Sequence, residues 1–296
     1  MATSTAVKTV TVDSGVEVFY REAHPASAKD IGALPVLLLL HGFPSSSFQY
    51  RNLIPRLATK YRVIAPDFPG YGFTVVPEAR KYEYTFVSLA NTTAAFVDAL
   101  GIKKFGMYVF DYGAPTGFRL ALQRPDAVTA IISQNGNAYE DGFGEQFWAP
   151  IKAVWADPSA ANLQKLAGLS SFETTKFQYV DGAPNASVIP PETFNLDYYL
   201  MTRPGNGEVQ LKYIIDYKTN VPLYPRFHEY FRERRPPILA IWGKNDTIFV
   251  PPGADAFKRD QPDAVVKFVD GGHFALESAL DEIASEILAF LAKNGI

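Results

Sequence analysis

Short apolar runs alternate along the chain with stretches in which apolar residues recur at helical spacing. The first two runs, Lys8–Val12 and Val16–Tyr20, flank the turn-forming residues Asp13-Ser14-Gly15 and predict a β-hairpin. Later runs are apolar throughout, which is typical of strands buried on both faces of a sheet. They span Pro35–Leu40, Tyr61–Ala65, Phe105–Phe110, Val128–Ile132, Ile238–Gly243 and Val265–Val269.

Between these runs the spacing of apolar residues predicts helices. Thr85–Leu100 has an apolar side and is ended by Gly101, and Asp281–Lys293 is a closing amphipathic helix. Strands that alternate with helices favour a mostly parallel sheet covered on both faces. The pattern therefore predicts an α/β fold with an eight-stranded, mostly parallel sheet.

The alternation stops over residues 137–235, where no comparable buried strand occurs. Apolar spacing there predicts helices around Trp148–Trp155, Glu192–Met201 and Glu208–Tyr217, separated by loops rich in Pro, Gly and Asn. This block is too long to be a simple loop. We therefore predict a core made of residues 1–136 and 236–296, with a helical cap formed by residues 137–235.

Composition narrows the classes of function. The 296 residues carry a net charge of -3, so there is no basic surface to attract nucleic acid or anionic lipid. The chain has no cysteine, which excludes disulfides, thiolate metal sites and a cysteine nucleophile. Met1–Lys8 lacks the apolar core of a signal peptide, and no apolar run is long enough to cross a bilayer. We expect a soluble cytoplasmic protein, monomeric or homodimeric, that needs no metal and no cofactor.

Three polar residues follow three different predicted strands. Asp111 ends the run Phe105–Phe110, Asp246 follows Ile238–Gly243, and His273 lies in a Gly-rich loop after the last strand. Loops that leave the carboxyl ends of parallel strands meet at one edge of the sheet, where ligands bind. An acid, a second acid and a histidine in this order form a nucleophile–acid–base triad. Each has a structural alternative: Asp111 and Asp246 as helix caps or turn residues, and His273 as a loop residue bonded to backbone.

The chain resembles the α/β-hydrolase superfamily over nearly its full length. The resemblance lies in five motifs that occur in the expected order: His41-Gly42-Phe43-Pro44, Asp67-Phe68-Pro69-Gly70-Tyr71-Gly72, Phe110-Asp111-Tyr112-Gly113, Gly243-Lys244-Asn245-Asp246 and Gly272-His273-Phe274. An Asp at the nucleophile position is similar to the epoxide hydrolases and haloalkane dehalogenases. One departure is Val109, where the family pattern has a small residue.

An Asp nucleophile suits attack on saturated carbon. A carboxylate is already ionised, so Asp111 can form an alkyl ester that a water activated by His273 then hydrolyses. Asp246 would hold the tautomer of His273, and the backbone N–H groups of Phe43 and Tyr112 would form the oxyanion hole. We expect structural roles for two further motif residues: His41 would hold the oxyanion loop, and Asp67 would hold its Gly-rich turn.

The leaving group distinguishes the epoxide hydrolases from the haloalkane dehalogenases. The dehalogenases of the family usually have Trp after the nucleophile and often Asn after the His-Gly pair, whereas this chain has Tyr112 and Phe43. The resemblance therefore implies an epoxide hydrolase, in which cap tyrosines protonate the opening ring. Tyr217 fits the late tyrosine, but Trp148 and Trp155 occupy the region of the early one.

Several other residues are candidates for contacts with the substrate or the leaving group: Trp148 and Trp155 through their indole N–H groups, Tyr139 or Tyr179 as a substitute acid, and Asn135 at the end of a strand. The aromatic cap favours a small apolar or aromatic substrate. Our first hypothesis is hydrolysis of an epoxide to a vicinal diol. The alternatives are a hydrolytic haloalkane or haloacid dehalogenase, and a non-catalytic ligand-binding protein on a hydrolase scaffold.

Overall fold

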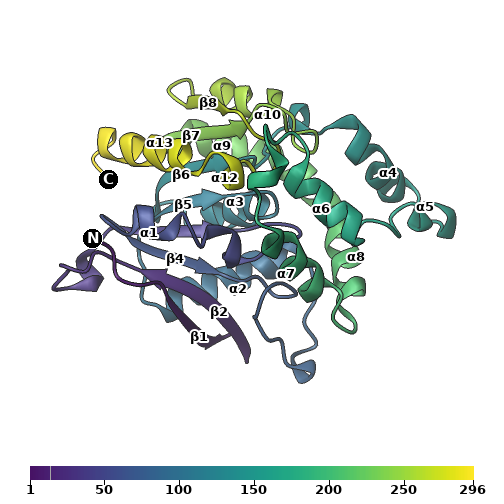
Figure 1. The fold of residues 1–296 in the computed structure, drawn as a ribbon, viewed down its shortest axis with the longest axis horizontal. Helices are drawn as coiled ribbons and strands as arrows, with labels where there is room; N and C mark the ends of the chain where they lie inside the picture. Colours follow the sequence, from purple (N-terminus) through teal and green to yellow (C-terminus); the bar gives the residue numbers. More distant parts are fainter. Residues whose placement is uncertain (14) are drawn as a thin grey trace.

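The computed structural model describes residues 1–13 and 15–296, and its centre is an eight-stranded sheet (Figure 1). The strand order is β1-β2-β4-β3-β5-β6-β7-β8. The pairs from β4 through β3 to β8 are parallel, while β1–β2 and β2–β4 are antiparallel. The predicted fold class and all eight predicted strands are confirmed.

The strands have bounds close to the predicted ones: β1 Ala6–Val12, β2 Val16–Ala23, β3 Val36–Leu40, β4 Arg62–Pro66, β5 Phe105–Val109, β6 Val128–Gln134, β7 Ile238–Gly243 and β8 Val265–Val269. β3, β5 and β7 are buried along nearly all of their length, as continuous apolar runs require. β1 is the exposed edge strand, paired with β2 as predicted. Of the turn predicted between them, Ser14 lies outside the described residues.

Helices cover both faces of the sheet. One face packs against α2 (Phe86–Ala99), α3 (Gly113–Gln123), α9 (Tyr224–Arg234) and α11 (Phe257–Asp260), and the other against α1 (Ile54–Leu57), α12 (Ala275–Ser278) and α13 (Leu280–Lys293). Thr85 begins α2, because its side chain accepts a hydrogen bond from the N–H of Ser88. The short helix α10 (Pro252–Asp255) follows β7.

The segment between β6 and β7 is helical, as the sequence predicts. It contains α4 (Glu145–Ala156), α5 (Ala160–Gln164), α6 (Phe172–Val180), α7 (Pro191–Met201) and α8 (Asn206–Asp216), followed by α9. Figure 1 shows α4–α8 together at the right of the sheet, opposite the two chain termini. α9 differs from them because it packs on α3, where the rings of Phe118 and Phe227 lie 5.5 Å apart. The division into core and cap at residues 137 and 235 stays a prediction.

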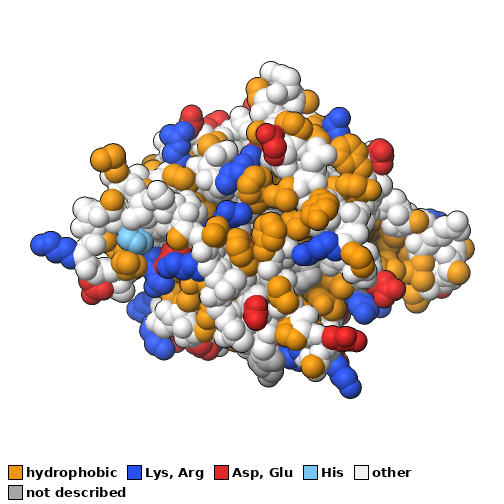
Figure 2. All heavy atoms as spheres, turned by 60° about the horizontal axis from the view of Figure 1, so that its bottom comes forward, with side chains coloured by type: hydrophobic (Ala, Val, Ile, Leu, Met, Phe, Trp, Pro, Cys, Tyr) orange, Lys and Arg blue, Asp and Glu red, His pale blue; other side chains and the backbone are white. Residues whose placement is uncertain are grey.

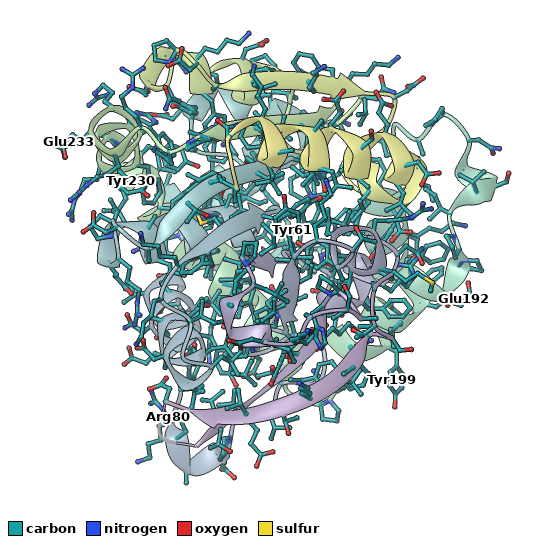
Figure 3. All side chains as sticks on the ribbon, turned by 90° about the vertical axis from the view of Figure 1, so that its left-hand side faces the viewer. Tyr61, Arg80, Glu192, Tyr199, Tyr230 and Glu233 are labelled. Carbon is teal, nitrogen blue, oxygen red and sulfur yellow. The ribbon has the colours of Figure 1, made fainter. Side chains whose placement is uncertain are left out.

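Seven short 3-10 helices connect the described elements: η1 Ile31–Ala33, η2 Ser47–Tyr50, η3 Glu78–Arg80, η4 Glu140–Gly142, η5 Ala186–Val188, η6 Tyr217–Thr219 and η7 Val221–Leu223. Figure 3 views the molecule from the side of the termini. Tyr61 lies centrally there, and its hydroxyl donates to the carbonyl of the last residue, Ile296, at 2.9 Å. Tyr199 of α7 instead points outward, with 70% of its surface exposed.

The surface carries an apolar area on one side. Figure 2 shows hydrophobic side chains gathered across the middle of the face that includes the β1–β2 end of the molecule. Large exposed apolar side chains in the described part of the chain include Val7, Phe73, Val75 and Val87. In that part of the chain, every helix is too short or too polar to cross a bilayer.

Candidate active site

Asp111 lies on a sharp turn between β5 and α3. Its backbone φ of 46° falls in the left-handed region that residues other than Gly rarely adopt. Gly113 permits the turn, since a Cβ there would overlap the Leu40 carbonyl. Val109, which departs from the family pattern, fits because a Cβ at Gly117 would lie only 2.7 Å from its Cγ1. The turn at Asp111 is therefore sharp. Because Gly117 has no side chain, it leaves room for the side chain of Val109.

The Asp111 carboxylate is held by backbone N–H groups. The N–H of Phe43 donates to its Oδ1 at 2.6 Å, and the N–H of Tyr112 also hydrogen-bonds the carboxylate. Gly42 allows this approach, because a Cβ there would lie 2.6 Å from the Tyr112 nitrogen. Both backbone groups predicted for an oxyanion hole thus lie at the Asp111 carboxylate.

The other oxygen of Asp111 faces His273. Its Oδ2 lies 3.8 Å from His273 Nε2, which has no hydrogen-bond partner among the described residues. Burial raises the pKa of Asp111 to about 6, against the opposing effect of His273 and the backbone N–H groups. Burial lowers the pKa of His273, but the carboxylates of Asp246 and Asp111 outweigh it, so the net shift is upward. Near neutral pH the carboxylate is ionised and can act as a nucleophile.

Asp246 orients the imidazole. Its Oδ2 accepts the Nδ1–H of His273 at 2.9 Å, and its Oδ1 accepts the backbone N–H groups of Ile248 and Phe249 at 2.8 and 3.1 Å. The structure therefore brings together the three residues that the sequence predicts for the triad. With Nδ1 protonated, Nε2 is free to accept a proton from water.

Asn135 lies behind this pair rather than in contact with a substrate. Its Nδ2 donates to Asp246 Oδ2 at 2.6 Å, and its Oδ1 accepts from Gly243 N at 3.1 Å and from the side chain of Gln134. The side chain is fully buried and both ends of the amide are engaged. The suggested substrate contact is therefore replaced by a supporting role, because β6 and β7 are neighbours and their ends meet.

His41 and Asp67 join the loops after β3 and β4. His41 Nε2 accepts from the Phe68 N–H at 2.9 Å, and burial lowers its pKa to about 3, so it is neutral. Asp67 accepts from the backbone N–H groups of Ser47 and Phe73 at 2.7 and 2.8 Å. These contacts match the structural roles that we expect for both residues.

Tyr217 lies in an aromatic setting beside Tyr112, the residue that follows Asp111. Its ring is 5.7 Å from that of Tyr112 and is fully buried, and its hydroxyl has no hydrogen-bond partner in the described part of the chain. Burial raises the pKa of this phenol well above its ordinary value, with contributions from Tyr224 and from Asp111.

The two cap tryptophans contribute rings rather than N–H donors. The indole N–H of Trp148 donates to the Ile248 carbonyl and that of Trp155 to the Ile214 carbonyl, both at 2.9 Å. Their rings contact Tyr217, with centroids 4.9 and 5.9 Å away. The suggestion that these N–H groups bind a leaving group is corrected, because backbone carbonyls already occupy them.

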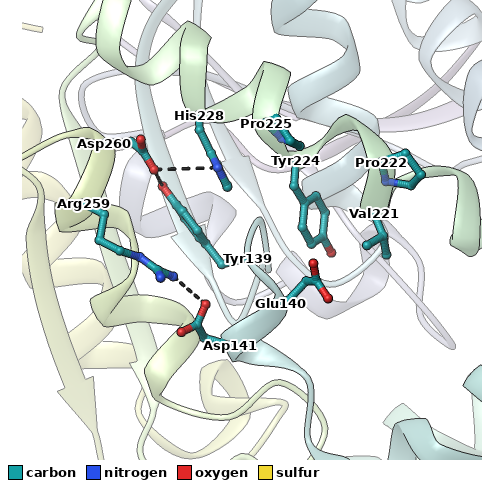
Figure 4. A pocket seen from close by; sticks show the side chains of 10 residues that line it. All are labelled: Tyr139, Glu140, Asp141, Val221, Pro222, Tyr224, Pro225, His228, Arg259 and Asp260. Atoms are coloured by element: carbon teal, nitrogen blue, oxygen red, sulfur yellow. Dashed lines mark hydrogen bonds and ion pairs between the residues drawn. The ribbon is translucent and has the colours of Figure 1, made fainter.

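Tyr139 belongs to a separate outer cavity of about 550 Å³ (Figure 4). Its hydroxyl donates to Asp260 at 3.0 Å and its ring stacks on His228, so the structure does not bring it to Asp111. Tyr224 also lines this cavity and is the main polar neighbour of Tyr217. Tyr224 could not be singled out from the sequence, since no motif marks one tyrosine among 16.

The suggested alternative acid Tyr179 is likewise engaged elsewhere. Its hydroxyl donates to Asp197 of α7 at 2.5 Å, and its ring stacks on Phe274 at 3.8 Å. Over residues 1–13 and 15–296, no group of three or more acidic or histidine side chains is arranged to hold a metal ion.

Comparisons with known proteins agree with this architecture. A family model described as alpha/beta hydrolase fold matches residues 35–280, so the chain belongs to the α/β-hydrolase family. A curated relative, "Uncharacterized hydrolase YNR064C" of Saccharomyces cerevisiae, is 44% identical over 96% of this chain and 97% of its own length. "Haloalkane dehalogenase 2" of Mycobacterium tuberculosis is 27% identical over 88% of each chain. The crystal structure of epoxide hydrolase VrEH1 from Vigna radiata shares the fold, with a TM-score of 0.73, 24% identity and 98% coverage of both chains. The protein is a hydrolase of this family.

Proposed function

We propose that the protein hydrolyses epoxides to vicinal diols through a covalent ester on Asp111. The observation that carries this proposal is the kind of donor at the site. The buried hydroxyl of Tyr217 is bonded to no carbonyl or carboxylate in the described part of the chain and has the Tyr224 hydroxyl as its polar neighbour, while both cap indole N–H groups are bonded to carbonyls. An opening epoxide needs an O–H donor for its alkoxide, and Tyr217 supplies one.

In the first half-reaction, Asp111 Oδ2 attacks a ring carbon. The C–O bond of the epoxide breaks, and the ring oxygen takes the proton of the Tyr217 hydroxyl. Oδ1 stays in its hydrogen bond to the Phe43 N–H, and Oδ2, which faces His273, is the attacking atom. The product is a hydroxyalkyl ester of Asp111 and a Tyr217 phenolate.

In the second half-reaction, His273 Nε2 takes a proton from water and the hydroxide attacks the ester carbon of Asp111. The resulting oxyanion lies at the N–H groups of Phe43 and Tyr112; one such donor contributes about 3 kcal/mol. The tetrahedral intermediate expels the diol oxygen, which takes the proton of the new carboxyl group. The imidazolium proton returns to the phenolate and restores Tyr217.

The ring environment supports an apolar or aromatic substrate. Phe86, Tyr112, Trp148 and Trp155 all have ring centroids within 6 Å of Tyr217. Such surroundings favour flat or apolar groups over charged ones. In this proposal, residues 137–235 form the cap that supplies one wall, and residues 1–136 and 236–296 form the core that carries the triad.

The second candidate is a hydrolytic dehalogenase. It is supported by the relative named haloalkane dehalogenase 2, which matches 88% of this chain. The same Asp111 ester would form, but a halide would leave, and a halide requires N–H donors or a polarised edge near the site. The engaged indole N–H groups weigh against this alternative.

A substrate panel separates the candidates. We expect diol formation from styrene oxide and cis-stilbene oxide, and no halide release from 1-chlorohexane, 1,2-dibromoethane or fluoroacetate. Halide release without any diol would favour the dehalogenase, and no reaction with either panel would favour a ligand-binding protein. A single turnover in ¹⁸O-labelled water should place the label in the Asp111 peptide, because the attacking water oxygen enters its carboxylate. Diol formation with no label in that peptide would reject the ester mechanism.

A further inference from the structure

Arg119 links the helix that follows Asp111 to the segment that follows Tyr217. Its Nε donates to Asn220 Oδ1 at 2.9 Å, and its Nη2 donates to the Thr219 carbonyl and Oγ1 at 3.2 and 3.0 Å. Thr219 is the last residue of η6, which begins at Tyr217. Three hydrogen bonds from one guanidinium therefore hold the residues immediately after the proposed acid.

This arrangement is costly for a charged side chain. Arg119 is only 9% exposed, and the acceptors of its three hydrogen bonds, on Thr219 and Asn220, are neutral. Burial lowers the pKa of its guanidinium, partly offset by Asp216. Asn220 is fully buried and its Nδ2 has no partner among the described residues. Burying a cation without a carboxylate partner is unfavourable, so stability alone does not account for the contact.

The contact of Arg119 links the segment that carries Asp111 to the segment that carries Tyr217. Asp111 is separated from α3 by Tyr112 alone, and Arg119 lies in the middle of α3. Asn220, which accepts from Arg119, donates its backbone N–H to the Tyr217 carbonyl at 2.9 Å. Because a helix is stiff over this length, the guanidinium sets the position of the Tyr217 backbone relative to Asp111.

We propose that Arg119 is a positioning residue that fixes the Tyr217 hydroxyl over the Asp111 carboxylate. The proposal rests on the proposed function, since Tyr217 matters as the acid that protonates the opening ring. Arg119 acts only through the Thr219–Asn220 segment. Its removal should therefore slow formation of the Asp111 ester and leave hydrolysis of that ester, which uses His273, unchanged.

The test compares the Arg119→Met, Arg119→Lys, Tyr217→Phe and Arg119→Met/Tyr217→Phe variants with wild type. Stopped-flow fluorescence of Trp148 and Trp155, whose rings contact Tyr217, follows the rates of ester formation and ester hydrolysis with styrene oxide. We expect Arg119→Met to slow ester formation about 10- to 100-fold, the size of effect that a misplaced catalytic group produces. Arg119→Lys should recover part of the loss, because it retains one donor.

Arg124→Met is the matched control. Arg124 caps the end of the same helix and pairs with Asp98 on the surface. Its removal tests general weakening of α3 and should leave both rates unchanged. The double variant is decisive: where Tyr217 is already Phe, removing Arg119 should cause no further loss in ester formation. An equal loss in both backgrounds, or an unchanged rate in Arg119→Met, would overturn the proposal.

Hydrogen exchange tests the positioning independently of turnover. The Asn220 amide is protected by its bond to Tyr217, so Arg119→Met should speed its exchange while amides 246–249 stay as in wild type. Unchanged exchange at residue 220 would overturn the positioning role, even in an enzyme that opens no epoxide. A wild-type protein without diol formation would instead reject the proposed function, so the two failures are distinguishable.

Discussion

Replacing Asp246 with Asn should trap the proposed ester on Asp111. The Asp246 carboxylate accepts four N–H groups: from Ile248 and Phe249 on one oxygen, and from His273 and Asn135 on the other. An Asn has one oxygen and one NH₂ in the same place. The backbone N–H groups cannot change, so the Asn oxygen should face them and its NH₂ should face His273.

That orientation changes the tautomer of the imidazole. His273 Nδ1 would have to accept a hydrogen bond, which moves the ring proton to Nε2, opposite Asp111. The imidazole could then no longer take a proton from water. A wrong tautomer of this kind lowers hydrolysis by about 10⁴-fold, or about 5 kcal/mol. Ester formation needs only the ionised Asp111, and it should continue. The new NH₂ group would also face the Nδ2–H donor of Asn135, so that two donors meet without an acceptor. This should destabilise the fold by about 1–3 kcal/mol.

The assay is intact-protein mass spectrometry after mixing Asp246→Asn with styrene oxide. We expect one equivalent of added substrate mass, mapped to the Asp111 peptide, and almost no diol. Asp270→Asn is the control, since Asp270 is an exposed acid in the loop that leads to His273 and pairs with Lys244 on the surface. Near-normal turnover of Asp246→Asn without an accumulated ester would refute the assigned roles.

Four further predictions follow from individual contacts. Tyr217→Phe should slow ester formation about 10²- to 10⁴-fold with little loss of stability, since the hydroxyl has no partner among the described residues; unchanged stopped-flow rates would contradict its role as acid. The rate of ester formation should fall about tenfold per pH unit below pH 6, because burial raises the pKa of Asp111 to about 6 and its protonated form does not attack; a pH-independent rate from pH 5 to 8 would count against this. Burial raises the pKa of Asp197 in the folded protein well above its ordinary value. The contribution of Asp197 to folding stability is therefore fully present below about pH 4, the pKa of this group in the unfolded chain, and is lost as the pH rises toward the folded-state pKa. In thermal melts, Asp197→Asn should therefore gain stability relative to wild type between pH 4 and 8, by at most about 1.4 kcal/mol per pH unit, and a pH-independent difference would reject the assignment. Gly117→Ala should destabilise the fold by about 1–3 kcal/mol, because its Cβ would lie 2.7 Å from Val109, and Val109→Ala in the same chain should restore stability, as urea unfolding can show.

Local pattern was sufficient for the sheet and the triad. Each buried strand is a continuous apolar run, and a run of this kind between helical segments has few other folded forms. Asp111, Asp246 and His273 each end such a strand, so parallel topology alone brings them to one edge. The apolar runs and the polar residues that follow them are local in the sequence, so the sequence could predict the strands and the candidate triad residues.

Tertiary structure decided what the polar groups around the triad do. The indole N–H of Trp148 is bonded to a carbonyl 100 residues away and that of Trp155 to one 59 residues away, so no local pattern reveals that they are engaged. The partners of Asn135, Tyr139 and Arg119 also come from other elements. Composition and periodicity determined which residues meet at the edge of the sheet. Only the packing of the helices between β6 and β7 decided which of the aromatic N–H and O–H groups are engaged, because a hydrogen bond depends on the position of both partners.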